Sequence, residues 1–509
     1  MKLMLECYER IDYMNKKSKP NFLIFMTAQQ RGDMVYPYGR AYTPNLDRFA
    51  KEGITFSRTY CPSPHCCPSR ATFFSGLYPS EHGVWNNVDV GIALSHGLNK
   101  GVRLFSEDLK EAGYRLYYSG KWHVSAIENP DERGWEISLL TAPKSEVIKE
   151  NGNWHASDLE KARWDRYRAL ATRQENCNRE EGQILRPGYF DYTQYGQSEN
   201  PFRDNEITVD GIDIIHNRKK TNEPWCQYIG TLGPHDPYFV PKRFLDRYDI
   251  NDIELPQSFN DRMEDKPSLY RRTRDRFDQL TEREHKESLR HYLAFCTYED
   301  YLFGEVLKAL EEKGETENTV VVYLSDHGDY AGDHGLWCKG LPSFSTNYHI
   351  PAIIRWPIGI KNAGRIEESF VSLADFAPTF LELAGISTQR KFTGKSLVPF
   401  LLNEKPDDWR DAIFTQTNGN ELYGIQRAVL TKDWKFVWNG FDYDELYDLK
   451  KDPHEMNNIA SSNEFRNVIR SMSQKIWRFA HEQRDVSINW YILAGLASFG
   501  PSYAFREDM

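Results

Sequence analysis

The sequence predicts an α/β fold in which helices cover both faces of a sheet, followed by a small C-terminal unit of antiparallel strands and a helix. Three observations support this prediction. Short apolar runs of the kind buried in parallel sheets recur along the chain. Amphipathic helical patterns lie between these runs, and such alternation favours an α/β sheet. Beyond about residue 405 the runs give way to short alternating segments and turn-rich stretches.

The clearest strand is predicted at Asn21–Met26, which reads NFLIFM. Thr319–Leu324 and Trp225–Gly230 have the same short apolar character and are predicted to be strands as well. The segment Thr281–Lys313 places apolar residues on one stripe of a helix. The residues of this stripe are Leu289, Leu293, Leu302, Val306 and Leu310.

The C-terminal region has short strand-like segments at Ala428–Leu430 and Lys435–Trp438, and a helix is expected near Glu464–His481. We therefore divide the chain into an N-terminal extension (1–19), a catalytic domain (20–404) and a C-terminal subdomain (405–509). Within the catalytic domain, residues 140–222 are polar, aromatic and weakly periodic. They are expected to form an insert of substrate-binding loops over the active face.

The composition excludes several classes of function. The 509 residues are 40% hydrophobic and 27% charged, and their net charge of −10 argues against a nucleic-acid binder. No apolar run reaches the ~20 residues that cross a membrane. The first twenty residues are charged where a secretory signal would be apolar, so the chain as it stands is expected to be cytoplasmic, or periplasmic or secreted if a signal was removed.

Eight cysteines show neither a compact disulfide framework nor a CxxC zinc pattern, so most are expected to be buried thiols. Cys66 is the exception, because it opens the run CCPSRATFFSG. Pro68 suits the first turn of a helix and Gly76 suits its end. Cys66 is therefore predicted at a helix N-terminus, which favours an anion, with Arg70 one turn further on. This placement indicates an activated cysteine beside an oxyanion site, although a lone buried cysteine is more often structural.

Three other polar clusters lie in or after strand-like segments. Gly113–His123 reads GYRLYYSGKWH, and on a strand Lys121 and His123 would point to the same side because they are two residues apart. Two surface polar residues would give the same pattern. In Pro-His-Asp-Pro, the two prolines rigidify a turn from which His235 could donate a proton, and a structural turn histidine is an equal alternative.

The last cluster follows Thr319–Leu324 and reads Ser-Asp-His-Gly, with Lys339 downstream. A carboxylate and an imidazole at a strand end, here Asp326 and His327, can bind one divalent ion. The later pair Asp333 and His334 is expected to shape the loop and not to contact the ion.

The run C-x-P-S-R-x-x-x-x-x-G resembles the signature of the type I sulfatase family, a branch of the alkaline phosphatase superfamily in which the first cysteine is oxidised to formylglycine. Only Cys66 fits this frame, because Cys67 would need a proline where the chain has Ser69. The run at Gly113–His123 is similar to the second family signature, with Leu116 in place of the usual threonine. The P-H-x-P, S-D-H-G and downstream lysine elements match as well, and the resemblance covers about residues 20–460.

The resemblance implies an alkaline-phosphatase-like fold, with a large, mixed, mostly parallel sheet between helices and a small C-terminal subdomain. It implies hydrolysis of sulfate monoesters after a formylglycine-generating maturase has modified Cys66. The implied substrate is a sulfated sugar or polysaccharide, or an aryl sulfate. It also implies one divalent metal, Ca²⁺ or alternatively Mg²⁺. The implied metal ligands are Gln29, Asp326, His327 and an oxygen of the modified Cys66.

The same resemblance implies roles for the remaining candidates. One hydroxyl of the hydrated formylglycine would attack sulfur, while Arg70 and Lys121 balance the negative charge. His235 and Lys339 would protonate the leaving alcohol. His123 would then remove the second hydroxyl proton, so that sulfate is expelled and the aldehyde is restored. Several cations are expected because charge in the transition state requires preorganised partners.

One position departs from the family pattern. The first strand of the family ends in D-D-x-R or D-Q-x-R, whereas this chain has Ala28 and Gln29 in that register. Ala28 offers no ligand atom, and a hard cation prefers charged oxygens. The chain is therefore an engineered inactive form, or its lineage has lost full activity, or another oxygen substitutes.

Two other functions stay open. A phosphonate monoester or phosphodiester hydrolase of the same superfamily would use a similar metal site, although the Pro68–Arg70 run favours a sulfatase. An inactive binder of sulfated glycans is suggested by Ala28 alone, and the retention of His123, His235 and Lys339 speaks against it.

Overall fold

The computed structural model describes residues 19–141, 146–170, 179–186, 189–219, 223–420, 422–488 and 493–505. At its centre is a sheet built from eight of the described strands. These strands are β1 (Asn21–Thr27), β2 (Ile54–Phe56), β4 (Arg115–Lys121), β5 (Glu136–Thr141), β11 (Trp225–Gly230), β13 (Thr319–Ser325), β15 (Ala352–Arg355) and β16 (Arg365–Glu367).

The strand order is β16-β2-β15-β13-β1-β11-β4-β5. All neighbours pair in parallel except β15, which is antiparallel to both β13 and β2. The sheet is thus mixed and mostly parallel, which confirms the predicted fold class. The three strands predicted from apolar runs are β1, β11 and β13, and they are adjacent in the sheet.

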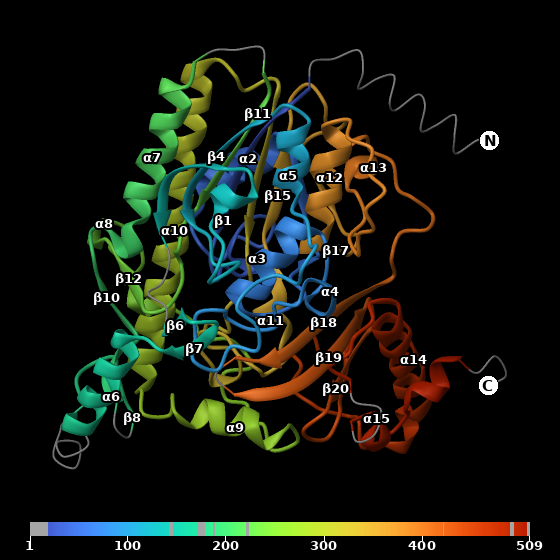
Figure 1. Ribbon diagram of the computed structural model, residues 1–509. Coiled ribbons are helices and arrows are strands. Elements are labelled where there is room, and N and C mark those ends of the chain that lie inside the picture. Colours follow the sequence, from blue (N-terminus) through green and yellow to red (C-terminus); the bar gives the residue numbers. More distant parts are fainter. Residues whose placement is uncertain are drawn as a thin grey trace.

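Helices cover both faces of this sheet, and the side chains of β1 therefore alternate between two hydrophobic cores. Phe22, Ile24 and Met26 belong to one hydrophobic cluster, and Leu23 and Phe25 belong to the other. In Figure 1, α7 and α10 lie on one side of the sheet and α5, α12 and α13 lie on the other. The helices of the first cluster are α3 (Cys66–Ser75), α5 (Phe105–Glu111), α12 (Phe376–Leu383) and α13 (Val398–Leu401). Those of the second are α2 (Pro44–Lys51), α7 (Asp204–Asn217) and α10 (Glu282–Lys313).

Helix α10 is the long helix predicted from its apolar stripe. The hydroxyl of Thr281 accepts a hydrogen bond from the Glu284 N–H, and Gly314 ends the helix with a φ of 69°. A threonine cap is the expected signal for the start of a helix, and a left-handed glycine is the expected signal for its end.

The small C-terminal unit is an antiparallel sheet that packs against a helix, as predicted. Its strands pair in the order β18 (Ala412–Gly419), β19 (Tyr423–Thr431), β20 (Trp434–Asn439) and β21 (Glu445–Asp448). Helix α14 (Arg466–Glu482) covers one face of this sheet, where the rings of Trp438 and Trp477 are 5.1 Å apart.

The expectation that 140–222 consists of loops is wrong for its last part, which forms α7 on the face of the main sheet. Ile207 and Ile215 are fully buried there, and Gly211 lets the helix approach β11 closely. A Cβ at position 211 would lie 2.5 Å from Cδ1 of Ile229. The range also contains the 3₁₀ helix Pro201–Arg203, the helix α6 (Asp158–Leu170) and the strands β6 (Val147–Glu150), β7 (Asn153–Ala156), β8 (Gln183–Arg186), β9 (Tyr189–Thr193) and β10 (Tyr195–Gln197).

Shorter described elements complete the fold: β3 (Thr59–Tyr60), β12 (Tyr238–Val240), β14 (His349–Ile350), β17 (Val371–Ser372), α4 (Pro79–His82), α8 (Lys242–Leu245), α9 (Ser268–Asp275), α11 (Ser345–Tyr348) and α15 (Leu493–Leu496). In the described ranges, no helix combines the length and the apolar character that a membrane span requires. The six cysteines in these ranges carry free thiols, of which five are buried and Cys338 is half-buried. Residues 1–18, Cys7 and Cys177 lie outside the described residues.

Candidate active site

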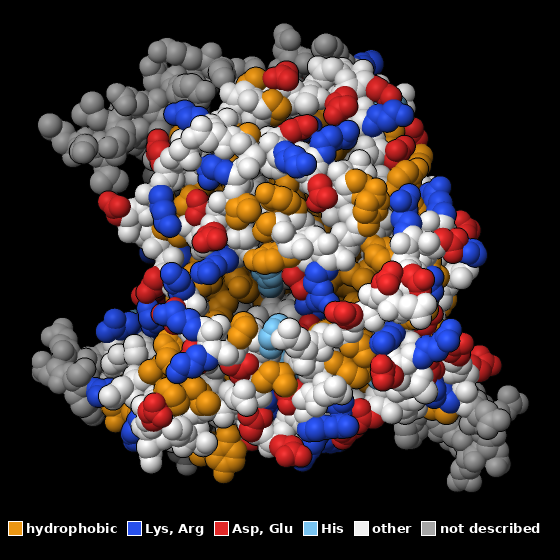
Figure 2. Space-filling model, turned by 180° about the vertical axis from the view of Figure 1, so that it is seen from behind, with side chains coloured by type: hydrophobic (Ala, Val, Ile, Leu, Met, Phe, Trp, Pro, Cys, Tyr) orange, Lys and Arg blue, Asp and Glu red, His pale blue; other side chains and the backbone are white. Residues whose placement is uncertain are grey.

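The polar clusters of the sequence meet at one edge of the main sheet. The neighbouring parallel strands β13, β1, β11 and β4 end at this edge, which is where α/β sheets bind ligands. The candidates that follow these four strands are Asp326 and His327 after β13, Gln29 after β1, His235 after β11, and Lys121 and His123 at the end of β4. Figure 2 shows a hollow near the middle of one face, with histidine side chains inside it and lysine and arginine side chains around it.

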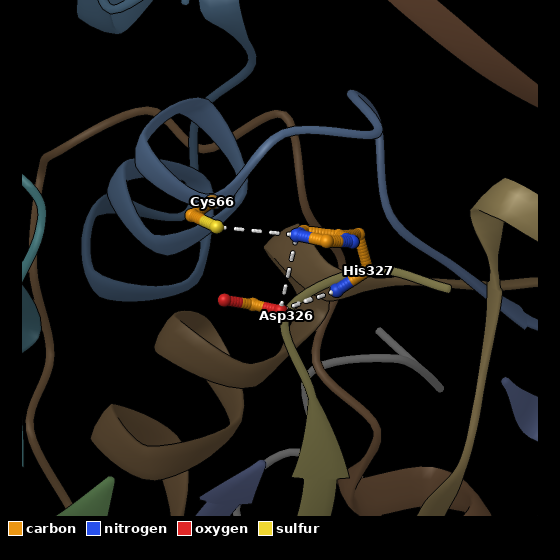
Figure 3. Close-up of side chains that lie close together, drawn as sticks. All are labelled: Cys66, Asp326 and His327. Carbon is orange, nitrogen blue, oxygen red and sulfur yellow. Dashed lines mark hydrogen bonds and ion pairs between the residues drawn. The ribbon is translucent and has the colours of Figure 1, made fainter. Parts of the chain in front are cut away.

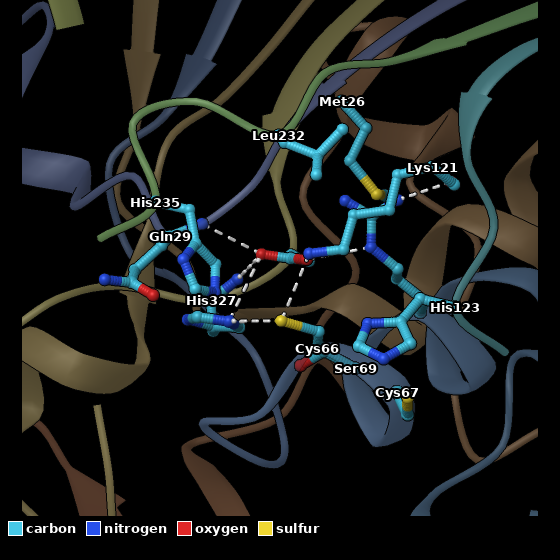
Figure 4. Close-up of polar contacts among 12 residues, drawn as sticks. Met26, Gln29, Cys66, Cys67, Ser69, Lys121, His123, Leu232, His235 and His327 are labelled. Carbon is cyan, nitrogen blue, oxygen red and sulfur yellow. Dashed lines mark hydrogen bonds and ion pairs between the residues drawn. The ribbon is translucent and has the colours of Figure 1, made fainter. Parts of the chain in front are cut away.

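Cys66 is the first residue of α3 and is almost completely buried. Its sulfur lies 3.2 Å from Nζ of Lys121 and 3.3 Å from Nε2 of His327 (Figures 3 and 4). Burial alone would raise the pKa of the Cys66 thiol, but Lys121, Lys339 and His327 outweigh it and hold that pKa well below its usual value. The helix N-terminus acts in the same direction. The pocket is therefore built to stabilise negative charge at position 66.

Asp326 and Arg70 form an ion pair beneath Cys66. Nε of Arg70 is 2.8 Å from Oδ2 of Asp326, and both side chains are fully buried. The other carboxylate oxygen accepts hydrogen bonds from the N–H groups of Gln29 and His327, at 3.0 and 2.9 Å. Burial acts to raise the pKa of Asp326, but His327 and Arg70 lower it below its ordinary value, so this carboxyl group is ionised.

Arg70 also offers a donor that the described residues leave unused. Its Nη1 donates to the hydroxyl of Tyr228 at 2.8 Å and to the carbonyl of Lys121 at 2.9 Å. Its Nη2 is buried and has no hydrogen-bond partner among the described residues. An orphaned guanidinium N–H next to Cys66 fits an anionic ligand, because leaving it unpaired is costly.

Lys121 and His123 both reach the Cys66 region, but not by the strand geometry that the sequence suggested. Strand β4 ends at Lys121, and His123 has a φ of 53°. Trp122 explains the turn, because its ring packs against Phe74 in the core while its Nε1 donates to the Glu128 carbonyl at 2.9 Å. The chain must therefore bend after Lys121, and the bend brings His123 back towards α3.

Asp89 is a site residue that the sequence analysis missed. Nε2 of His123 lies 2.9 Å from its Oδ1. Burial would lower the pKa of His123, but Cys67 and Asp89 outweigh burial and raise that pKa well above its usual value. No motif marks Asp89, which lies in a loop 34 residues before His123.

On the other side of the site, His235 and Lys339 form a close pair. Nζ of Lys339 is 2.6 Å from Nε2 of His235 and 2.5 Å from Oε1 of Gln29. The amide nitrogen of Gln29 donates to Asp236 at 3.1 Å and to Asp329 at 2.5 Å. In the view of Figure 4, Gln29 and His235 lie on one side of the Cys66 sulfur, and Lys121 and His123 lie on the other.

The residues present fit a divalent cation only in part. Cys66, Asp326 and His327 each offer a donor atom, and these atoms lie within 4.8 Å of one another. Gln29, the fourth expected ligand, has its side-chain oxygen paired with Lys339 instead. Ala28 is fully buried and brings no carboxylate to this set, so Asp326 is the one carboxylate among the expected ligands.

Asp333 and His334 hold the loop after β13, as the sequence suggested. The carboxylate of Asp333 accepts hydrogen bonds from Nη1 of Arg31 and from the hydroxyl of Ser258, both at 2.6 Å. The His334 ring stacks on Phe344, and its Nδ1 lies 2.8 Å from Oδ2 of Asp261.

The turn that carries His235 rests on a buried pair of carboxyl groups, Asp204 and Glu299. The Leu232 and Gly233 N–H groups donate to Asp204 at 2.7 and 2.8 Å, and the two carboxyl groups are hydrogen-bonded to each other. Burial raises the pKa of Asp204 to about 7 and raises that of Glu299 well above its usual value. Since Asp204 accepts both backbone bonds, the shared proton belongs on Glu299.

We expect the Glu299→Gln variant to remove the pH dependence that this pair gives to folding. Both folded-state pKa values are raised, that of Asp204 to about 7, so the stability that the protonated pair contributes is complete below about pH 4 and decreases as the pH rises towards these values. A glutamine keeps an N–H in place of the proton and an oxygen for the Thr231 hydroxyl. At pH 8 the variant should be more stable than the parent by at least about 1 kcal/mol, with no gain at pH 4.

Urea unfolding at the two pH values measures this difference. The Asp204→Asn variant is the control and should be less stable at both, because an amide cannot accept both backbone hydrogen bonds. The same slope of stability against pH in the parent and in Glu299→Gln would show that the pair holds no shared proton.

Comparisons with known proteins indicate the family of the chain. The family model described as "Sulfatase" matches residues 20–386, and that described as "N-sulphoglucosamine sulphohydrolase, C-terminal" matches residues 332–482. An arylsulfatase of Clostridium perfringens is 28% identical over 471 residues, which cover 89% of this chain and 92% of that protein. An N-acetylglucosamine-6-O-sulfatase of Bacteroides thetaiotaomicron is 27% identical and covers 92% of this chain and 87% of its own length. A solved phosphonate monoester hydrolase of Agrobacterium radiobacter has the same fold, with a TM-score of 0.72 at 22% identity over 92% of this chain and 97% of its own.

Proposed function

The chain belongs to the sulfatase family of the alkaline phosphatase superfamily, and from this premise we propose that it hydrolyses sulfate monoesters of a sugar or polysaccharide through a formylglycine made from Cys66. Its fold is alkaline-phosphatase-like, as expected, and it is a sulfuric ester hydrolase. The observation that carries the finer proposal is the environment of Cys66. The sulfur lies at a helix N-terminus, 3.2 Å from Lys121 and 3.3 Å from His327, with the unpaired Arg70 Nη2 buried nearby.

When present, a formylglycine at position 66 supplies a geminal diol as nucleophile, and a divalent cation, Ca²⁺ or Mg²⁺, supplies a Lewis acid. Asp326, His327 and Gln29 are the residues proposed to hold the cation together with an oxygen at position 66. Conversion of Cys66 requires a formylglycine-generating maturase as partner. The chain itself contributes the burial and the fixed charges around this position.

Arg70 and Lys121 would neutralise the charge that develops on the nucleophile and on the sulfate. Arg70 is held rigidly by Asp326 and by the hydroxyl of Tyr228, at 2.8 Å each. Lys121 reaches Cys66 from the end of β4. Cations fixed before the reaction need no rearrangement in the transition state, and this preorganisation is the main source of electrostatic catalysis.

His235 and Lys339 would give the proton to the leaving alcohol. Their nitrogens are 2.6 Å apart, so a proton can pass between them. Nδ1 of His235 lies 2.5 Å from the Asp236 carbonyl and 3.3 Å from its carboxylate. This contact fixes the ring and leaves Nε2 to face the site.

His123 would accept the proton of the second hydroxyl group, which expels sulfate and regenerates the aldehyde. Asp89 orients its ring at 2.9 Å and stabilises the charged form that His123 takes once it has accepted this proton. The pair of His123 and Asp89 thus lies on the opposite side of Cys66 from His235. This arrangement separates the base of the second step, His123, from the acid of the first step, His235.

A sulfated sugar is the substrate class we propose. The relative from B. thetaiotaomicron is an N-acetylglucosamine-6-O-sulfatase, and the C-terminal family model carries the name of an N-sulphoglucosamine sulphohydrolase. Part of the insert 140–222 borders the site, because the Glu146 N–H donates to the Asp89 carbonyl at 2.8 Å. Next to this contact, Trp154 of β7 stacks on His96 with ring centroids 3.5 Å apart. We propose that this part of the insert contacts the sugar.

We expect kcat/KM for sulfate monoesters to exceed that for phosphonate monoesters and phosphate diesters by at least about tenfold, equal to ~1.4 kcal/mol of transition-state stabilisation. The reason is the combination of the Cys66 signature with Lys121, His123, His235 and Lys339. Matured protein is assayed on a panel of sulfated sugars, an aryl sulfate and the two phosphorus esters.

A preference for phosphorus esters would instead favour the phosphonate hydrolase function, which the shared fold and Gln29 permit. Tight binding of sulfated sugars without turnover, in the parent and in an Ala28→Asp variant alike, would favour the inactive glycan binder.

A further inference from the structure

Cys67 lies next to the nucleophile position and has no role in the proposed reaction, yet it belongs to a second convergent set of metal-binding side chains. Cys67, Asp89 and His123 each offer one donor atom, and the three atoms lie within 4.8 Å of one another. In Figure 4 the ring of His123 lies close to both Cys66 and Cys67. Cys67 is fully buried, whereas the side chains of His123 and Asp89 are 9% and 15% exposed, so solvent reaches one side of the set.

Backbone contacts hold this set in place. The Cys67 N–H, in the first turn of α3, donates to Oδ1 of Asn87 at 3.3 Å, and the Val88 N–H donates to the Cys67 sulfur at 3.4 Å. The Asn87 N–H donates to Oδ1 of Asn420 at 2.9 Å. The loop that carries Asp89 is thus tied to the helix that carries Cys67, and the donors are arranged before any cation arrives.

The donor types differ from those proposed for the catalytic cation. A thiolate, an imidazole and a carboxylate suit Zn²⁺, whereas Ca²⁺ and Mg²⁺ prefer oxygen. At the first set, formylglycine replaces the Cys66 sulfur with oxygen, so after maturation that set favours cations that prefer oxygen ligands. At the second set the Cys67 sulfur remains. Two adjacent sets would therefore select different cations.

We propose that Cys67, Asp89 and His123 form a separate site for a soft divalent cation such as Zn²⁺, and that occupancy of this site stops turnover. The cation takes the place of the Cys67 thiol proton, which passes to solvent, and it binds the lone pair of the His123 ring. His123 then has no lone pair with which to accept the diol proton. The inhibitory part rests on the proposed sulfatase function, whereas cation binding does not.

Binding is tested in the full-length Cys66→Ala variant, in which position 66 offers no ligand. Co²⁺ serves as the spectroscopic probe for Zn²⁺, and we expect a thiolate-to-cobalt charge-transfer band. The added substitution Cys67→Ser should abolish the band, and Asp89→Asn should weaken Zn²⁺ binding at least ~10-fold, since even outer partners of a ligand contribute that much.

Cys61 provides the matched control, because it is another buried free thiol of the same segment. Adding Cys61→Ser to Cys66→Ala should leave the band unchanged. Persistence of the band after Cys67→Ser, or its absence in Cys66→Ala itself, would overturn the site.

Inhibition is tested on matured protein with Ca²⁺ in excess and increasing Zn²⁺. Each variant is compared with its own rate without zinc, and Cys67→Ser should need at least about tenfold more Zn²⁺ for half inhibition. Equal zinc sensitivity in parent and variant would overturn the inhibitory role even if the cobalt band behaves as expected. A matured chain inactive on all sulfate esters would count against the proposed function and leave the binding result standing.

Discussion

The Cys66→Ala variant, produced together with the maturase, should hydrolyse sulfate esters at least about 10⁴-fold more slowly than the matured parent, because removal of a covalent nucleophile costs roughly 10⁴–10⁶ in other hydrolases. The structure gives the reason for so large an effect. Lys121, Arg70 and the N-terminus of α3 are arranged around an anion at position 66. Alanine leaves these charges in place with nothing for them to activate. The measurement is kcat on an aryl sulfate, with thermal unfolding to show that the variant is folded.

The same chain provides internal controls for maturation. Cleavage after Arg58 and Arg70 gives one tryptic peptide that contains Cys61, Cys66 and Cys67. Tandem mass spectrometry should locate the aldehyde at Cys66 and find thiols at the other two positions. An aldehyde at Cys67 with an intact Cys66 would contradict the proposal, as would a Cys66→Ala variant that keeps most of the parent rate. The Cys61→Ala variant should keep kcat close to that of the parent.

Local patterns predicted the elements that local physics determines. Asn21–Met26 is a strand because its apolar residues are buried on both faces of the sheet, and α10 begins and ends at a threonine and a glycine that cap it. Helix α7 was missed because its pattern is weak, with Gly211 in its interior. That glycine lowers helix propensity, but it is required where α7 contacts Ile229. The antiparallel pairing of β15 depends on long-range topology, which no local pattern reports.

The site divides in the same way. Motifs in the sequence marked the side chains that surround Cys66. The fold brings them together because they follow the ends of β13, β1, β11 and β4, which lie side by side in the sheet. The partners of these side chains, Asp89 for His123 and the Asp204–Glu299 pair beneath His235, lie in other segments and carry no motif. The contact of Gln29 with Lys339 is also invisible in the sequence.

Ala28 is the position at which the expected chemistry and the structure disagree most. It follows β1 directly, its N–H donates to the Gly233 carbonyl at 2.9 Å, and its side chain is fully buried. By strand alternation a side chain at position 28 follows the side of Met26, which contacts Tyr228 and through it Arg70. A carboxylate at this position would therefore face the Arg70 side of the site.

Ala28→Asp should raise both metal affinity and turnover of the matured chain by at least about 10–100-fold, the range measured for the outer partners of metal ligands. The expected cation set now contains one carboxylate, Asp326, whose oxygens are already engaged by Arg70, Gln29 and His327. A second carboxylate would add negative charge where a divalent ion must be held. Neighbouring Asp329 is a poor substitute, because burial raises its pKa to about 6 and Tyr238 and Gln29 occupy one of its oxygens.

Ala28→Asn is the matched control, since it supplies an oxygen of the same reach without charge and should restore much less. Calorimetric Ca²⁺ titration and sulfatase assays are run on the parent and both variants. The Ala28→Asp variant should also be destabilised by a chelator and stabilised by Ca²⁺, because a buried carboxylate without its cation is costly. Equal Ca²⁺ affinity and equal rates in parent and Ala28→Asp would mean that another oxygen already completes the site. If both forms hydrolyse sulfate esters at this equal rate, Gln29 is the candidate for that oxygen, because its side chain could turn from Lys339 towards the cation.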